Sequence, residues 1–234
     1  MEHVLEIINI IGIISFAAAG AMIAIDKETD LFGVLFLSII TCFGGGMIRD
    51  MLAGQAIDRE LPLFFTGLKM EIIVCVLTAF AVFCMAYIFK EHYVKEEAYV
   101  EKINNVLDAL GLGVFASAGT LAYAELGPFV AISMGLISSV GGSIVRDVLL
   151  RDIPFVLRKR VYAVACIAGS AVCYLVVSVL MNGKDSASVV ATISCMVVIF
   201  VIRMCATYFK WNMPKAIVFS KMKLDSDEKE NVNI

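Results

Sequence analysis

The sequence predicts an all-α, polytopic membrane protein with seven transmembrane helices, of which the first six form two inverted three-helix repeats. Of its 234 residues, 60% are hydrophobic and only 18% are charged, whereas soluble domains have about 45–50% apolar residues. The excess is gathered in blocks of about 20 residues, the length that crosses the bilayer core as a helix. A run of glycines followed by an arginine and an aspartate occurs in two of these blocks.

Polar residues divide the chain into the expected elements. The apolar blocks, which we expect to be the membrane helices, cover residues 5–25, 31–53, 66–89, 104–124, 128–149, 160–181 and 188–209. The expected organisation is a first repeat (1–89), a polar cytoplasmic linker (90–103), a second repeat (104–182), the seventh helix (183–209) and a cytoplasmic tail (210–234). The first block resembles a signal peptide, but its start carries Glu2 and Glu6 and no basic residue. We therefore expect it to be retained as a helix.

Three landmarks in the same order show that the chain repeats itself. The matching pairs are "IGIISFAAAG" (11–20) with "LGLGVFASAG" (110–119), "GGGMIRDML" (44–52) with "GGSIVRDVL" (141–149), and "RELP" (59–62) with "RDIP" (151–154). Each unit contains three helices, an odd number, so the second unit enters the membrane the other way up. This arrangement is an inverted repeat with a pseudo-two-fold axis in the membrane plane.

Basic residues in the connections indicate the orientation. If the N-terminus is outside, the connections on the inner side carry eight Lys and Arg residues without the tail, and those on the outer side carry three. Cytoplasmic loops are enriched in Lys and Arg. The bias predicts an integral membrane protein with its N-terminus outside and its C-terminus in the cytoplasm.

The glycines lie near the middle of the second and fifth helices. The candidate pore-kink residues are Gly44, Gly45, Gly46, Gly141, Gly142 and Ser143. Each glycine costs about 1 kcal/mol of helix propensity relative to alanine. Close helix packing is one interpretation. A kink beside a water-filled path is the other, and we favour it because irregular backbone at this depth is tolerated there. Thr41, Ser138 and Ser139 are candidate pore-lining residues, although such side chains also bond their own helix backbone.

The charged doublets lie towards opposite mouths of the two helices, at Arg49–Asp50 and Arg146–Asp147. Neighbouring residues on a helix point about 100° apart, so we expect that neither doublet pairs internally. Asp147 has Arg151 at the favourable i, i+4 spacing. The sequence thus predicts charges at both mouths of a polar path. Arg203, deep in the seventh helix, has no evident partner.

Other functional classes lack a signature. The seven cysteines lie inside apolar blocks without C-x-x-C spacing, and we interpret them as packing residues. His3 and His92 are isolated at block edges, and Glu71 is interpreted as an interface anchor. The net charge of −3 provides no basic field for nucleic acid. No catalytic constellation or P-loop is visible, so we expect no enzymatic activity, metal or cofactor.

Two copies of G-G-[GS]-x-x-R-D, each followed by a proline (Pro62 or Pro154), together with a seventh helix, resemble the bacterial members of the trimeric intracellular cation (TRIC) channel family. The resemblance covers about residues 5–209. It implies a homotrimer of the bacterial plasma (inner) membrane with a pore in each subunit, flanked by helices two and five, that admits monovalent cations, potassium especially. It places the kinks at the glycines and the motif charges at the two doublets. Ser143 departs from the pattern of the first copy, which has glycine.

Three functions fit these observations. The leading interpretation is a passive monovalent cation channel. The alternative is a carrier for a small zwitterion such as glycine, in which an arginine and an acid hold the carboxylate and ammonium groups. The third is a non-transporting membrane scaffold whose glycines serve only helix contacts.

Overall fold

The computed structural model describes residues 2–53, 69–90, 96–158, 161–180 and 186–211. Within these ranges the regular secondary structure is helical, and seven helices are long and apolar enough to cross a membrane. This confirms the predicted all-α class and the seven spans. Pro62, Arg59, Lys184 and most of the tail, including Pro214, lie outside the described residues.

The helices agree with the apolar blocks of the sequence. The first repeat contains α1 (Glu2–Asp26), α2 (Leu31–Ala53) and α4 (Lys69–Ile88), and the second contains α6 (Glu97–Ala122), α7 (Pro128–Leu149) and α9 (Tyr162–Leu175). α9 continues into a π-helical turn, η2 (Val176–Leu180), and α10 (Ala187–Tyr208) follows. The short elements η1 (Ala124–Leu126) and α8 (Phe155–Arg158) flank α7.

α6 starts earlier than its apolar pattern indicates. It begins at Glu97, inside the segment predicted as a polar linker. Glu101 and Lys102 in this additional segment are exposed, so the segment is helical without being apolar. Hydropathy identified the part of the helix that is buried and missed the part that extends beyond it.

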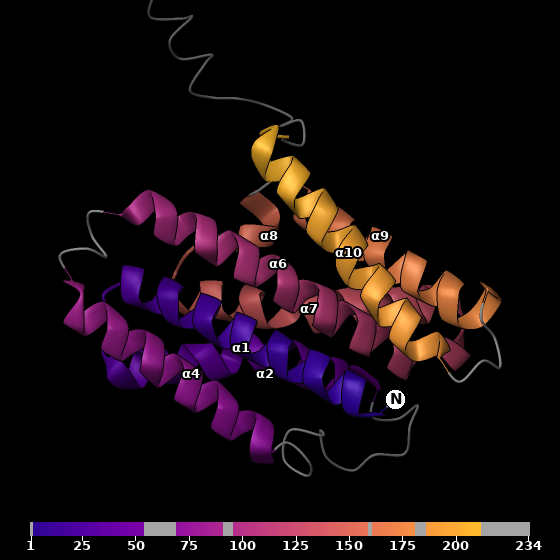
Figure 1. Ribbon diagram of the computed structural model, residues 1–234, viewed down its shortest axis with the longest axis horizontal. Helices are drawn as coiled ribbons and strands as arrows, with labels where there is room; N and C mark the ends of the chain where they lie inside the picture. Colours follow the sequence, from indigo (N-terminus) through magenta and orange to yellow (C-terminus); the bar gives the residue numbers. More distant parts are fainter. Residues whose placement is uncertain (1, 54–68, 91–95, 159–160, 181–185, 212–234) are drawn as a thin grey trace, which may run out of the picture.

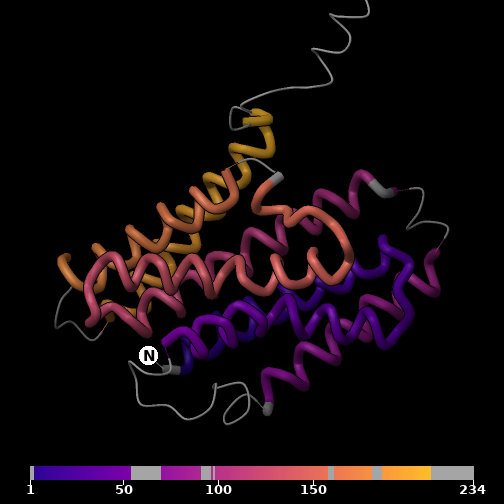
Figure 2. Tube along the Cα trace, turned by 180° about the vertical axis from the view of Figure 1, so that it is seen from behind, coloured from indigo at the N-terminus to yellow at the C-terminus, as the bar shows by residue number. Residues whose placement is uncertain are grey.

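The two repeats lie side by side and run in opposite directions. α1 and α6 are packed against each other and antiparallel, and α2 packs on α7 behind them in the view of Figure 1. α4 covers the outer side of the first repeat, and α9 covers the second (Figure 2). α10 packs on α6 and α9, so it extends the second repeat alone. Large apolar side chains such as Phe32, Phe80 and Val197 are exposed on the outer faces, as expected for helices surrounded by lipid.

Candidate transport site

The glycines of the two repeats form the crossing of α2 and α7. A β-carbon added at Gly45 would lie 2.2 Å from the carbonyl oxygen of Ser138, and one added at Gly142 would lie 2.3 Å from that of Thr41. Thr41 and Ser138 are equivalent in the repeat alignment, as are Gly45 and Gly142. The contacts are therefore reciprocal, like those of an isologous interface. Only glycine allows the two backbones to approach this closely.

Both glycine helices are continuous. α2 remains α-helical from Leu31 to Ala53, and α7 from Pro128 to Leu149. The glycines therefore do not unwind the backbone, and a bend of the helices at these positions stays a prediction. Gly44 and Gly141 also contact the opposite helix, the first against Gly142 and the second against Gly45. The close packing considered as an alternative accounts for these four glycines.

Gly46 differs from the other glycines because it faces a cavity. A β-carbon there would meet nothing nearer than a nitrogen of Arg49, at 3.9 Å. Its counterpart Ser143 is buried and bonds the carbonyl oxygen of Val140 at 2.8 Å. Thr41 and Ser139 likewise donate to Leu37 and Leu136 of their own helices. Among the three candidate pore-lining residues, Ser138 lines the cavity.

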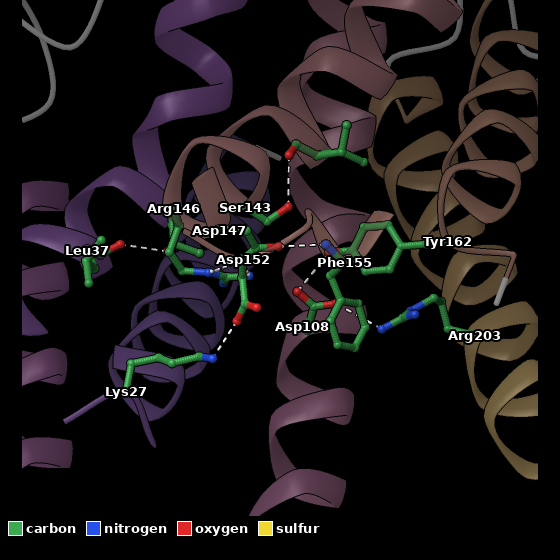
Figure 3. Close-up of polar contacts among 12 residues, drawn as sticks. Lys27, Leu37, Asp108, Ser143, Arg146, Asp147, Asp152, Phe155, Tyr162 and Arg203 are labelled. Carbon is green, nitrogen blue, oxygen red and sulfur yellow. Dashed lines mark hydrogen bonds and ion pairs between the residues drawn. The ribbon is translucent and has the colours of Figure 1, made fainter. Parts of the chain in front are cut away.

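Each charged doublet pairs internally, which corrects the prediction from helix geometry. Nε and Nη2 of Arg49 donate to Oδ1 of Asp50 at 2.8 and 2.7 Å. Arg146 makes the same two bonds to Asp147, at 2.9 and 2.7 Å (Figure 3). The angle between neighbouring residues applies to the Cα–Cβ directions. The long arginine side chain bends across that angle and presents its planar fork to the carboxylate.

The predicted pair of Asp147 with Arg151 is not formed, because α7 ends at Leu149 and Arg151 adopts a left-handed conformation with φ of 57°. The second oxygen of Asp147 instead accepts the N–H of Phe155 at 2.7 Å. Asp147 therefore holds both the end of α7 and the start of α8. The neighbouring Asp152 pairs with Lys27 of the first repeat, so the two repeats are joined at this end of the molecule (Figure 3).

A cavity of about 340 Å³ opens beside the first doublet. Its polar lining consists of Asn9, Arg49, Asp50, Glu71 and Ser138, and Phe43 and Phe115 are among its apolar lining residues. Arg49 also donates through Nη1 to Ser138 Oγ at 3.3 Å, which connects the first doublet to the second repeat. The cavity contains one arginine and two acidic residues, so its formal charge is negative. Glu71, which we interpreted from the sequence as an interface anchor, therefore also lines the cavity.

A buried cluster lies on the other side of the pseudo-two-fold axis. Nη2 of Arg203 donates to Oδ2 of Asp108 at 2.9 Å, and the hydroxyl of Tyr162 donates to Oδ1 at 3.0 Å. The guanidinium carbon of Arg203 lies 4.3 Å from the centre of the Tyr162 ring. Arg203, which lacked a partner in the sequence, therefore has two. Asp108 was not among the site residues predicted from the sequence. It is an acid within an apolar block, and intramembrane acids are functional candidates by default.

The two polar regions occupy equivalent places in the repeats. The alignment of residues 11–20 with 110–119 also aligns Asn9 with Asp108. Asn9 lines the cavity beside Arg49, whereas Asp108 is covered by Tyr162 and Arg203. Within the described ranges no group of three or more His, Cys, Asp or Glu residues could hold a metal ion.

Solved structures with a similar architecture include TRIC channels. One, described as showing the structural basis for conductance through TRIC cation channels, has a TM-score of 0.74 and 29% identity, covering 91% of this chain and 97% of that one. Another, a TRIC trimeric intracellular cation channel orthologue from Rhodobacter sphaeroides, has a TM-score of 0.73 and 26% identity, with 89% and 99% covered. The similarity confirms the resemblance stated from the motifs.

Sequence relatives agree with this likeness. The UPF0126 inner membrane protein YadS of Escherichia coli K12 is 36% identical over 213 residues, which cover 88% of this chain and 93% of the relative. The UPF0126 membrane protein YvgT of Bacillus subtilis is 33% identical over 211 residues, with 89% and 95% covered. A family model described as "Glycine transporter" matches residues 6–87 and 105–178, one segment for each repeat. Because the two matched segments cover most of the chain, the chain belongs to the family that this model describes, "Glycine transporter".

Proposed function

We propose that the protein is a monovalent cation channel of the inner membrane, with a path along the α2–α7 crossing in each subunit. The observation that carries the proposal is the charge of the cavity. Asp50 neutralises Arg49 through two hydrogen bonds, which leaves the Glu71 carboxylate to determine the sign. A cleft lined by one sign of charge concentrates the opposite ion.

The similarity to structures described as TRIC cation channels supports this function, and the description of one as trimeric supports a homotrimer. The relatives described as inner membrane proteins support the location. With the N-terminus outside, as the basic residues indicate, the cavity faces the outer side, because α1 begins and α2 ends beside it. Asp147, Lys27 and Asp152 then face the cytoplasm. Gly46 and Ser138 border the path, and the other motif glycines hold its walls together.

The test is single-channel recording in planar bilayers. The purified protein should carry currents that reverse at the potassium equilibrium potential. Glu71→Gln should reduce potassium conductance severalfold at low ionic strength and less at high salt, because ions in solution screen a fixed charge. Glu125→Gln is the matched control, since Glu125 lies in η1 and does not line the cavity. Absence of any conductance from pure, assembled protein would contradict the proposal.

The second candidate is a carrier for a small zwitterion, which the family description favours. An arginine and an acid in the lining of one cavity, Arg49 and Glu71, suit a carboxylate and an ammonium group, and inverted repeats suit alternating access. Proteoliposomes should then take up labelled glycine saturably, and Arg49→Ala should abolish uptake. Offering potassium and glycine to the same preparation separates the two functions. The scaffold alternative would show neither flux.

A further inference from the structure

The buried cluster of the second repeat contains a cation supplied by the protein itself. Arg203 is 3% exposed and Asp108 is 6% exposed. In the first repeat the equivalent region, beside Asn9, is the open cavity. Two halves related by pseudo-symmetry are thus in different states, one hollow and one filled.

Arg203 does not belong to the repeat. It is carried by α10, which packs on α6 and α9 and has no counterpart in the first repeat. Asp108 and Tyr162, in contrast, are on α6 and α9 of the second repeat. The repeat therefore provides a carboxylate and an aromatic ring, and the added helix provides the positive charge that contacts both (Figure 3).

The arrangement of Asp108 and Tyr162 has the features of a cation site. The Tyr162 hydroxyl holds one carboxylate oxygen of Asp108, and the other faces the guanidinium. The guanidinium lies over the face of the ring, where the ring quadrupole attracts cations. A carboxylate oxygen and an aromatic face are general cation ligands, so this chemistry does not require the cation to be tethered.

Arg203 is an incompletely satisfied occupant. Its Nε is buried and has no hydrogen-bond partner among the described residues. A buried arginine compensates its loss of hydration only when its donors are used. The charges of Asp108 and Arg203 therefore balance, but one hydrogen-bond donor of Arg203 is unused. A guanidinium with an unused donor is displaced more easily than a fully hydrogen-bonded one.

The cluster also adjoins the motif charges. Tyr162 packs edge-on against Phe155, with ring centres 5.8 Å apart. The N–H of Phe155 bonds Asp147, which pairs with Arg146. Arg146 is 1% exposed, and its Nη1 has no partner within the described part of the chain. A movement of Tyr162 would therefore be transmitted to the Arg146–Asp147 doublet through Phe155 alone.

We propose that Asp108 and Tyr162 form a binding site for a monovalent cation, which the Arg203 guanidinium occupies in this structure, and that its withdrawal with α10 opens this half of the path. The second part rests on the proposed channel function, whereas the first part does not. In this state the tethered guanidinium takes the place of a permeating ion and closes the path.

The binding test uses Arg203→Ala in the full-length assembled protein in detergent. The variant leaves the Asp108 carboxylate without its charge partner, so guanidinium or potassium at constant ionic strength, balanced with N-methylglucamine, should raise its melting temperature. At ten times the dissociation constant the expected rise is about 3–6 °C. The unchanged protein should show no such rise, because its site is filled. The matched control, Asp108→Asn with Arg203→Met, removes both charges and should not respond. A folded Arg203→Ala protein that responds no more than this control would overturn the proposal.

If Arg203→Ala does not assemble, guanidinium present during purification should restore assembly, while the double variant assembles without it. Failure of guanidinium and potassium to restore assembly, with the double variant intact, would also overturn the proposal.

Flux is measured separately. Arg203→Ala should conduct potassium severalfold better than the unchanged protein, and guanidinium should reverse the gain. If cations stabilise Arg203→Ala but no variant shows flux, the channel function is contradicted and the binding site is retained. If flux is the same with and without Arg203→Ala, the closure of the path by Arg203 is overturned.

Discussion

Phe16 and Phe115, which occupy equivalent positions in the two repeats, stack on each other with ring centres 5.1 Å apart and planes inclined by 19°. Residues related by a two-fold axis contact each other only where they lie close to that axis. The pair therefore marks the pseudo-two-fold axis inside the protein, and Phe115 also lines the cavity. The repeat seen in the sequence is thus a physical contact in the core.

This pair should be energetically coupled. Phe16→Leu and Phe115→Leu each remove a stacked ring, and a double-mutant cycle should give a coupling of about 0.5–1.5 kcal/mol. Thermal unfolding of the four proteins measures it. Phe32→Leu and Phe36→Leu make the comparison cycle, since these rings also stack but on an exposed face. Additive effects at Phe16 and Phe115 would contradict an axis contact that stabilises the fold.

The glycines should separate into packing residues and a cavity residue. Gly45→Ala places a methyl group against the backbone of the facing helix and should cost about 1–3 kcal/mol, as overpacking does. Gly46→Ala meets open space and should be neutral or stabilise the helix by up to about 1 kcal/mol. Melting temperatures of the assembled proteins test this.

Flux gives the complementary result. Gly46→Ala should change conductance while the fold is retained, because its methyl group enters the cavity. A Gly46→Ala protein that is less stable than Gly45→Ala would show that the packing assignment is wrong.

The two doublets should differ in their sensitivity to loss of the acid. Asp147→Asn leaves Arg146 charged in a site where it is 1% exposed and should cost about 3–5 kcal/mol. Asp50→Asn should cost less, because Arg49 borders the cavity, where water can hydrate it. Unfolding measurements on both variants decide the order. Adding Arg146→Met to Asp147→Asn should recover much of the loss, and equal losses for the two single variants would contradict this account.

The Lys27–Asp152 pair should contribute little to stability, although it joins the two repeats. Both side chains are more than a third exposed, so Lys27→Ala should cost no more than about 1 kcal/mol, and less in high salt. The charge-reversed protein, Lys27→Asp with Asp152→Lys, should regain the loss. A large loss that persists in concentrated salt would show that the contact is not a screened surface ion pair.

Hydropathy and internal repetition were sufficient to predict the class, the spans and the inversion, because both are patterns in the order of residues and require no knowledge of contacts between side chains. The same alignment would have related Asn9 to Asp108 had it been extended by two residues. The cluster of Asp108, Tyr162 and Arg203 was out of reach, since it brings together three helices distant in sequence. The internal pairing of Arg49 with Asp50 was missed for a different reason. The prediction used backbone directions alone and neglected the reach of a long side chain.

A protein made of two perfect inverted copies would look the same from either side of the membrane. The helix α10 is attached to one copy alone. It removes that equivalence and makes the two membrane-facing sides of the molecule different. Voltages of equal size and opposite sign should consequently drive unequal currents, and the sign of this rectification should depend on which way round the protein has inserted.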